Sequence, residues 1–130
     1  MSSSIFDASA VLAVLNGERG QEAAEPFLFG ATISAVNYSE VLKKVAELDG
    51  SIAKIQLLLA KQNINVIPFD ATHAVQTAAI WREGKPLGLS FADRACVALG
   101  MMLELPILTT DADMASTDLP VDIKLIRKRH

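Results

Sequence analysis

Acidic residues recur where the sequence predicts that a strand ends or a helix begins. Asp7 and Asp111 follow short apolar runs. Glu40 and Asp93 stand in the first turns of predicted helices. Strand ends and helix starts share one edge of a parallel α/β sheet, so we expect these four carboxylates to meet there. Carboxylates without Cys or His ligands suit a hard cation such as Mg²⁺ or Mn²⁺ and indicate phosphoryl chemistry, with Asp113 as a candidate fifth ligand.

Each acid also has a structural explanation. Glu40 lies three residues after Asn37, and this is the spacing of a capping box. Asp93 has the same spacing from Ser90, and Asp7 could cap the first helix. Taken singly, each acid fits a cap better than a ligand. The two roles are compatible because both place the carboxylate at the same edge, and packed carboxylates without a cation would repel one another.

Hydroxyl groups flank the acids, and Ser9, Ser90, Thr109 and Thr110 could orient the carboxylates or a bound water. Each of them could instead be a cap or turn residue. A Ser-His-Asp triad has no support because neither His73 nor His130 pairs with a plausible nucleophile, and no glycine-rich phosphate loop is present.

Composition predicts one globular domain spanning residues 1–130, with 51% apolar residues. The sequence has neither a membrane-length apolar run nor a signal-peptide start, so we expect a cytoplasmic protein.

The single Cys96 lies in an apolar run and is predicted to be buried. The net charge of −3 argues against nucleic-acid binding by bulk charge, although the chain is mildly basic outside the five acids. The basic tail 127–129 is either a solvated terminus or a phosphate contact.

Short apolar runs alternate with amphipathic segments. The pattern predicts strands at 4–6, 31–34, 65–68, 106–109 and 121–126. It predicts helices at 9–15, 21–29, 36–48, 51–62, 70–83 and 90–103. Pro26 should kink or shorten the second helix, and 110–113 is expected to be a turn. This alternation indicates an α/β protein whose parallel sheet is covered on both faces.

Five stretches of the sequence resemble PIN-domain ribonucleases, specifically the VapC-type toxins of type II toxin-antitoxin pairs. They occur in the order of that family and are Phe6–Leu12, Ile33–Leu42, Val66–Asp70, Leu87–Arg94 and Pro106–Asp111. The resemblance implies a three-layer α/β/α sandwich with a mostly parallel central sheet. It also implies metal-dependent cleavage of single-stranded RNA, a homodimer, and neutralisation by a small VapB-like antitoxin.

Carried over by position, the resemblance makes four acids the catalytic set that holds Mg²⁺ or Mn²⁺, with Asp113 as an auxiliary ligand. Ser9 and Asn37 match positions that support the site, as Thr109 could. The four acids are Asp7, Glu40, Asp93 and Asp111.

The expected substrate is single-stranded or structured RNA, and which RNA is bound would depend on the surface around the acids. Candidate backbone contacts are Lys43, Lys44 and Arg94, with Arg82 and Lys85 as further bases. Tyr38, Trp81 and Phe91 could stack on bases, but we expect Trp81 and Phe91 to be buried. The antitoxin is expected to lie along Pro26–Phe29 and the helices flanking Asp49–Gly50, and to pair an Arg with the carboxylates.

Two other functions remain open. An aspartyl-phosphate phosphatase or signalling receiver also carries an aspartate after its first strand, but here Ser9, not an acid, stands two residues after Asp7. A catalytically silent PIN-like module could bind RNA or a protein without cleaving anything. Titration with Mn²⁺ would separate the silent module from the enzyme.

Overall fold

A five-stranded parallel sheet forms the centre of the molecule, in a computed structural model that describes residues 3–127. The strands are β1 (Ile5–Phe6), β2 (Thr32–Ser34), β3 (Asn65–Ile67), β4 (Ile107–Thr109) and β5 (Ile123–Leu125). Their order is β3-β2-β1-β4-β5, and every neighbouring pair is parallel. The predicted parallel sheet is therefore confirmed, with β1 at its centre.

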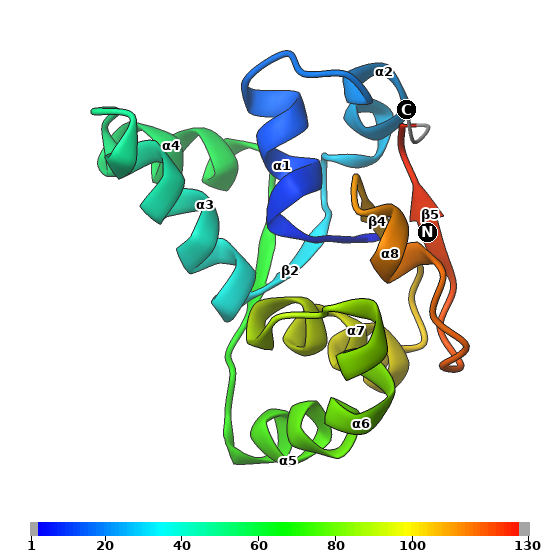
Figure 1. Ribbon diagram of the computed structural model, residues 1–130. Coiled ribbons are helices and arrows are strands. Elements are labelled where there is room, and N and C mark those ends of the chain that lie inside the picture. Colours follow the sequence, from blue (N-terminus) through cyan, green and yellow to red (C-terminus); the bar gives the residue numbers. More distant parts are fainter. Residues whose placement is uncertain (1–2, 128–130) are drawn as a thin grey trace.

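Helices cover both faces of this sheet (Figure 1). Those preceding β3 are α1 (Ala8–Leu15), α2 (Gln21–Ala24), α3 (Ala35–Glu47) and α4 (Ile52–Lys61). Those following it are α5 (Ala71–Ala79), α6 (Trp81–Gly84), α7 (Phe91–Leu103) and α8 (Ala112–Ala115). Short 3₁₀ helices cover Glu25–Phe27 and Lys85–Leu87.

The alternation of side chains along the short strands separates two cores. Phe6, Ile33 and Leu108 pack with α1 to α4 on one face. Ile5 and Ile107 pack with α7 on the other face. Successive strand residues point to opposite faces, so even a two-residue strand contributes to both cores. The expected three-layer α/β/α sandwich is confirmed.

Gly100 lets α7 lie close against the sheet. A Cβ atom at this position would stand 2.6 Å from Ile107 Cδ1 and 2.8 Å from Val121 Cγ2. This close approach fixes the distance between α7 and the sheet, and thereby the position of the first turn of α7, which carries Asp93. Cys96, on the same helix, is fully buried as predicted. None of the helices in residues 3–127 is long and apolar enough to cross a membrane.

Three predicted elements differ from the structure in detail. The helix expected at 70–83 is interrupted at Ile80, whose side chain is buried in a core cluster with Leu89 and Met114, so tertiary packing overrides the local helical pattern. The segment 21–29 changes from α to 3₁₀ helix at Glu25, directly before Pro26, so the α-helix is shortened as the proline predicts. The turn expected at 110–113 instead enters α8, because the Asp111 side chain caps a short helix there.

Candidate active site

Asp7 lies at the carboxyl end of the central strand, β1, and is only 5% exposed. Its Oδ1 atom accepts the backbone N–H of Ala10 at 2.9 Å, which makes Asp7 the N-cap of α1. The predicted capping role is therefore confirmed. Burial raises the pKa of Asp7 from 3.8 to about 6, and the charge of Asp93 adds to the rise, although hydrogen bonds from Thr109, Ser9 and Ala10 oppose it.

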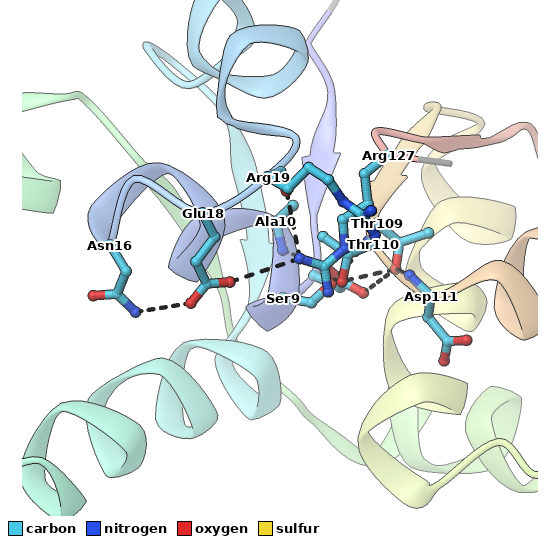
Figure 2. Close-up of polar contacts among 10 residues, drawn as sticks. Ser9, Ala10, Asn16, Glu18, Arg19, Thr109, Thr110, Asp111 and Arg127 are labelled. Carbon is cyan, nitrogen blue, oxygen red and sulfur yellow. Dashed lines mark hydrogen bonds and ion pairs between the residues drawn. The ribbon is translucent and has the colours of Figure 1, made fainter. Parts of the chain in front are cut away.

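Two hydroxyl groups hold the Asp7 carboxyl group in place. Ser9 Oγ donates to Oδ1 at 2.7 Å, and Thr109 Oγ1 donates to Oδ2. Each hydroxyl also accepts a backbone N–H, Ser9 from Thr110 at 3.0 Å and Thr109 from Asp111 at 3.0 Å. Figure 2 shows Ser9, Thr109 and Thr110 gathered beside Asp111. The network thus ties the turn between β4 and α8 to the start of α1.

Asn37 joins the two helical layers at this edge. Its Nδ2 atom donates to Glu40 Oε1 and to the backbone oxygen of Ala92, each at 3.1 Å. Because both partners are acceptors, the amide orientation is fixed. The Oδ1 atom is buried and has no partner within residues 3–127. A water molecule or the hydration shell of an ion could satisfy this acceptor.

Asp93 and Asp111 are each engaged as helix caps through a single oxygen. Asp93 Oδ2 accepts the N–H of Ser90 at 2.9 Å, and Ser90 Oγ accepts the N–H of Asp93 at 3.1 Å, which completes the predicted capping box. Asp111 Oδ1 accepts the N–H groups of Asp113 and Met114. Asp113 is exposed. The second oxygens of Asp93 and Asp111 accept no hydrogen bond from the described part of the chain and could face a ligand.

Three of the acids lie within electrostatic reach of the buried Cys96 thiol. Burial raises its pKa well above the usual value, and the charges of Asp7, Asp93 and Glu40 raise it further. Within the described part of the chain, Asp111 is linked to Asp7 only through its backbone N–H, which Thr109 Oγ1 accepts. Among residues 3–127, however, no three Asp, Glu, His or Cys side chains are grouped closely enough to hold a metal ion as they stand.

The residues present nevertheless fit a hard cation. The donors are carboxylate oxygens, caps occupy only one oxygen of Asp93 and Asp111, and the buried Asn37 Oδ1 has no partner in the described part of the chain. Side-chain rotations would have to close the group around an ion. The assignment of Asp7, Glu40, Asp93, Asp111 and Asp113 as ligands stays a prediction.

The PIN domain family model matches residues 4–119, which is most of the chain. The chain belongs to the PIN domain family. The family resemblance on which the expected site residues rest is therefore confirmed. No curated protein matches the chain.

Solved structures of similar fold include toxin-antitoxin complexes. One from Klebsiella pneumoniae aligns with a TM-score of 0.78 at 17% identity, covering 98% of this chain and 100% of that chain. DNA-bound VapBC from Salmonella typhimurium aligns with a TM-score of 0.69 at 14% identity, covering 95% of this chain and 98% of that chain. FitAcB from Neisseria gonorrhoeae aligns with a TM-score of 0.66 at 22% identity, covering 92% of this chain and 94% of that chain.

Two of the predicted RNA contacts border the acidic edge of the PIN domain. Lys43 and Lys44 line a hollow of about 230 Å³ together with Glu40 and Glu47. Their amino groups lie 2.7 Å and 3.9 Å from the Glu47 carboxylate, and both side chains are mostly exposed. A phosphate could displace these surface ion pairs, which are weak in water.

Arg94 points away from the acids toward α5. Its Nη1 atom donates to the backbone oxygen of Thr77 at 3.1 Å, and its Nε atom is buried without a partner within residues 3–127. The guanidinium therefore lies at the carboxyl end of α5, where a positive charge is stabilised by the helix dipole. An RNA contact through Arg94 stays a prediction, and it would require this hydrogen bond to break.

The expectation that Trp81 and Phe91 are buried is wrong, because each side chain is 51% exposed. Both begin helices, α6 and α7, so their positions precede the part of each helix that faces the core. Tyr38, the other aromatic candidate, is partly buried against the α1–α3 core. Sequence reasoning also missed Phe69, which contacts Phe91 and lies two residues after the end of β3.

Proposed function

We propose that the chain is a metal-dependent endoribonuclease, the toxin of a toxin-antitoxin pair, which hydrolyses phosphodiester bonds in single-stranded RNA. The observation that carries the proposal is the buried Asp7 carboxyl group. It lies at the carboxyl edge of the sheet, is held by two hydroxyl groups, and is within electrostatic reach of Asp93. Membership of the PIN family supports the nuclease activity, and the Klebsiella and Salmonella complexes support the toxin role.

The chain supplies oriented negative charge to the reaction. Mg²⁺ or Mn²⁺ held by Asp7, Glu40, Asp93 and Asp111, with Asp113 as an auxiliary, would supply phosphate polarisation and water activation. Ser9 and Thr109 keep the Asp7 carboxyl group from rotating, and Asn37 restrains Glu40. Hydrolysis by water with departure of the 3′ oxygen leaves a 5′-phosphate and a 3′-hydroxyl group.

Cleavage of a labelled single-stranded RNA by the purified chain tests the proposal. We expect cleavage with Mg²⁺ or Mn²⁺, none with chelator, and none by folded Asp93→Asn. The control is Asp70→Asn, because Asp70 is an exposed N-cap of α5 and Asn caps a helix equally well. Cleavage by Asp93→Asn at the parent's rate, or chelator-resistant cleavage by a rigorously purified sample, would refute the nuclease assignment.

A groove between α1 and α3 suits a small antitoxin. The Lys43–Lys44 hollow, which includes Glu40, shares Leu12 and Lys44 with a second hollow of about 260 Å³ lined by Val45, Leu48 and Ile55. An antitoxin segment with an arginine followed by apolar residues would pair its charge with the carboxylates and bury its apolar side chains beyond them. The exposed Phe27 and Phe29 near α2 offer a further apolar contact.

Co-expression with a small neighbouring reading frame tests this partner. The two proteins should co-purify as an inactive complex, and Leu48→Glu should disrupt it because Leu48 is 64% exposed beside the groove. The matched control is Val75→Glu, a 65% exposed position on α5. Equal loss of the complex in both variants, or failure of the parent to co-purify, would refute this docking site. Light scattering of the free chain tests the homodimer that the family resemblance implies.

The burial of Asp7 also bears on the phosphatase or receiver alternative. A phosphate-accepting aspartate must reach the phosphoryl donor, whereas Asp7 is 5% exposed and hydrogen-bonded through both oxygens. The catalytically silent alternative predicts Mn²⁺ or RNA binding without cleavage. The cleavage assay above therefore separates it from the nuclease.

A further inference from the structure

Two aromatic rings on the α5–α7 side of the molecule are half exposed, and among residues 3–127 a cation covers only one of them. Lys85 Nζ lies 5.1 Å over the centroid of the Trp81 ring, so that ring already has a partner on its face. Phe91 instead meets the Phe69 ring at 5.5 Å between centroids, with the two planes inclined at 80°. This edge-to-face contact covers only part of the ring, and 51% of Phe91 remains exposed.

Phe91 is carried by a rigid part of the candidate active site. It is the first residue of α7, directly after the N-cap Ser90 and two residues before Asp93. The capping box fixes this turn from within, and the hydrogen bond from Asn37 to the Ala92 oxygen ties it to α3. An exposed ring on so constrained a turn cannot easily fold back into the core.

Phe69 supports the ring from the neighbouring connection. It precedes Asp70, the N-cap of α5, in the loop that leaves β3 at the carboxyl edge of the sheet. Phe69 is itself half-buried and meets the His73 ring at 6.1 Å, with the planes inclined at 70°. The chain thus braces the Phe91 ring on one side and leaves half of it exposed, in the helical turn that also carries Asp93.

We propose that Phe91 is the platform on which one unpaired base of the RNA stacks beside the scissile phosphate, with Phe69 as its support. The inference rests on the proposed ribonuclease function and adds a basis for selecting single strands. Stacking needs only a flat π surface, so it accepts any base, but a base paired within a helix cannot reach it. Phe91 begins the helix whose first turn carries Asp93, so the stacked base would belong to a nucleotide close to the cleaved bond.

Substitution of Phe91 combined with altered substrates tests the platform. Phe91→Ala should lower kcat/KM for single-stranded RNA about tenfold, mainly through KM, as expected for loss of one stacked base. Phe91→Tyr should keep the parent's value because it keeps the ring. The control is Leu103→Ala, which truncates another exposed apolar side chain at the far end of α7, roughly 18 Å away.

Abasic nucleotides locate the contact. An abasic nucleotide at one position beside the scissile bond should slow cleavage by the parent about tenfold, and Phe91→Ala should be insensitive to it. Abasic positions elsewhere should affect both proteins equally. Position-independent effects, or equal kcat/KM for Phe91→Ala and the parent, would overturn the proposal. If Phe91→Ala instead abolishes only antitoxin binding or dimer formation, the ring is a protein contact and the proposal is also overturned.

A binding assay separates failure of this inference from failure of the proposed function. A Trp81→Phe, Phe91→Trp variant carries its only tryptophan at the platform. Single-stranded RNA in Ca²⁺ should quench its fluorescence while the same strand in a duplex does not, with gels showing that the RNA stays intact. If the parent cleaves no RNA but this quenching occurs, the nuclease proposal fails and the platform stands. Absence of quenching, or equal quenching by the duplex, refutes the platform.

Discussion

Asp7→Asn should stabilise the metal-free protein at neutral pH. Burial raises the pKa of Asp7 from 3.8 to about 6, so the native state binds the proton more tightly than the unfolded chain does. The protonated Asp7 side chain therefore contributes its full stability to the fold below about pH 4, and this stability is lost as the pH rises through about 6. A rise of about two pKa units corresponds to roughly 3 kcal/mol at pH 7.5. Asn removes this cost because it carries no charge.

Lost hydrogen bonding reduces that gain. The Asn oxygen can accept from Ser9 and Ala10, and its amide can donate to Thr109 Oγ1, whose own proton then loses its acceptor. We therefore expect a net gain of about 1–2 kcal/mol at pH 7.5. For a domain of this size that is a Tm increase of roughly 3–10 °C. Near pH 4 Asp7 is neutral in the parent as well, so the gain should disappear and Asp7→Asn should be no more stable than the parent, or less stable by the cost of the lost hydrogen bonding.

Thermal unfolding of both proteins between pH 4 and pH 8, in chelator, measures this difference. Asp70→Asn is the matched control, since Asp70 is also an N-cap but is exposed. It should change Tm little at any pH. A Tm difference for Asp7→Asn that does not depend on pH, or a loss of stability at pH 7.5, would show that the buried Asp7 charge does not destabilise the native state.

The same proteins test Asp7 as a ligand. Mn²⁺ at one hundred times its Kd should stabilise the parent by about 2.7 kcal/mol if it binds only the native state. Asp7→Asn should lose most of this shift, and Asp70→Asn should keep it. Equal Mn²⁺-induced shifts in the parent and Asp7→Asn would leave Asp7 as a helix cap and no more.

Three further predictions concern single contacts. Gly100→Ala should cost about 1–3 kcal/mol in urea unfolding, because its Cβ would stand 2.6 Å from Ile107 Cδ1, and an unchanged midpoint would contradict the close approach of α7. Thr109→Val removes a donor to the Asp7 carboxyl group, so an NMR titration should find the pKa of Asp7 higher still. Arg94→Gln, which removes the charge, should lower stability by about 1 kcal/mol without changing the salt dependence of RNA binding, whereas loss of a phosphate contact would reduce that dependence by about one unit of slope.

The sequence predicts most local parts of the site, although the capping box expected for Asn37 and Glu40 is wrong, because α3 begins earlier and Ser34 is its N-cap. Asp7 follows a strand and caps α1, and Ser90 and Asp93 form a capping box, because both patterns involve residues only three positions apart. The order of short strands and helices is sufficient to predict a parallel sheet, which brings these local motifs to one edge.

Contacts between distant segments could not be predicted in this way. Ser9 accepts the N–H of Thr110 across 101 positions, and Asn37 reaches Ala92 across 55. No periodicity encodes such pairs, because they depend on how the two helical layers meet. The error at Phe91 has a related cause. Its apolar character predicted burial, but the first residue of α7 lies beyond the core that the rest of the helix covers.

The structure also explains how the acids can coexist before a cation binds. Asp93 and Asp111 face helix N-termini, where backbone N–H groups and the helix dipole stabilise negative charge, and Glu40 is exposed and hydrogen-bonded to Asn37. Asp7 has a helix cap as well, but its burial outweighs the hydrogen bonds and raises its pKa. The unfavourable charge is thus concentrated on one residue at the centre of the sheet. A cation would relieve that cost most at Asp7, which is why substitution there separates metal binding from helix capping.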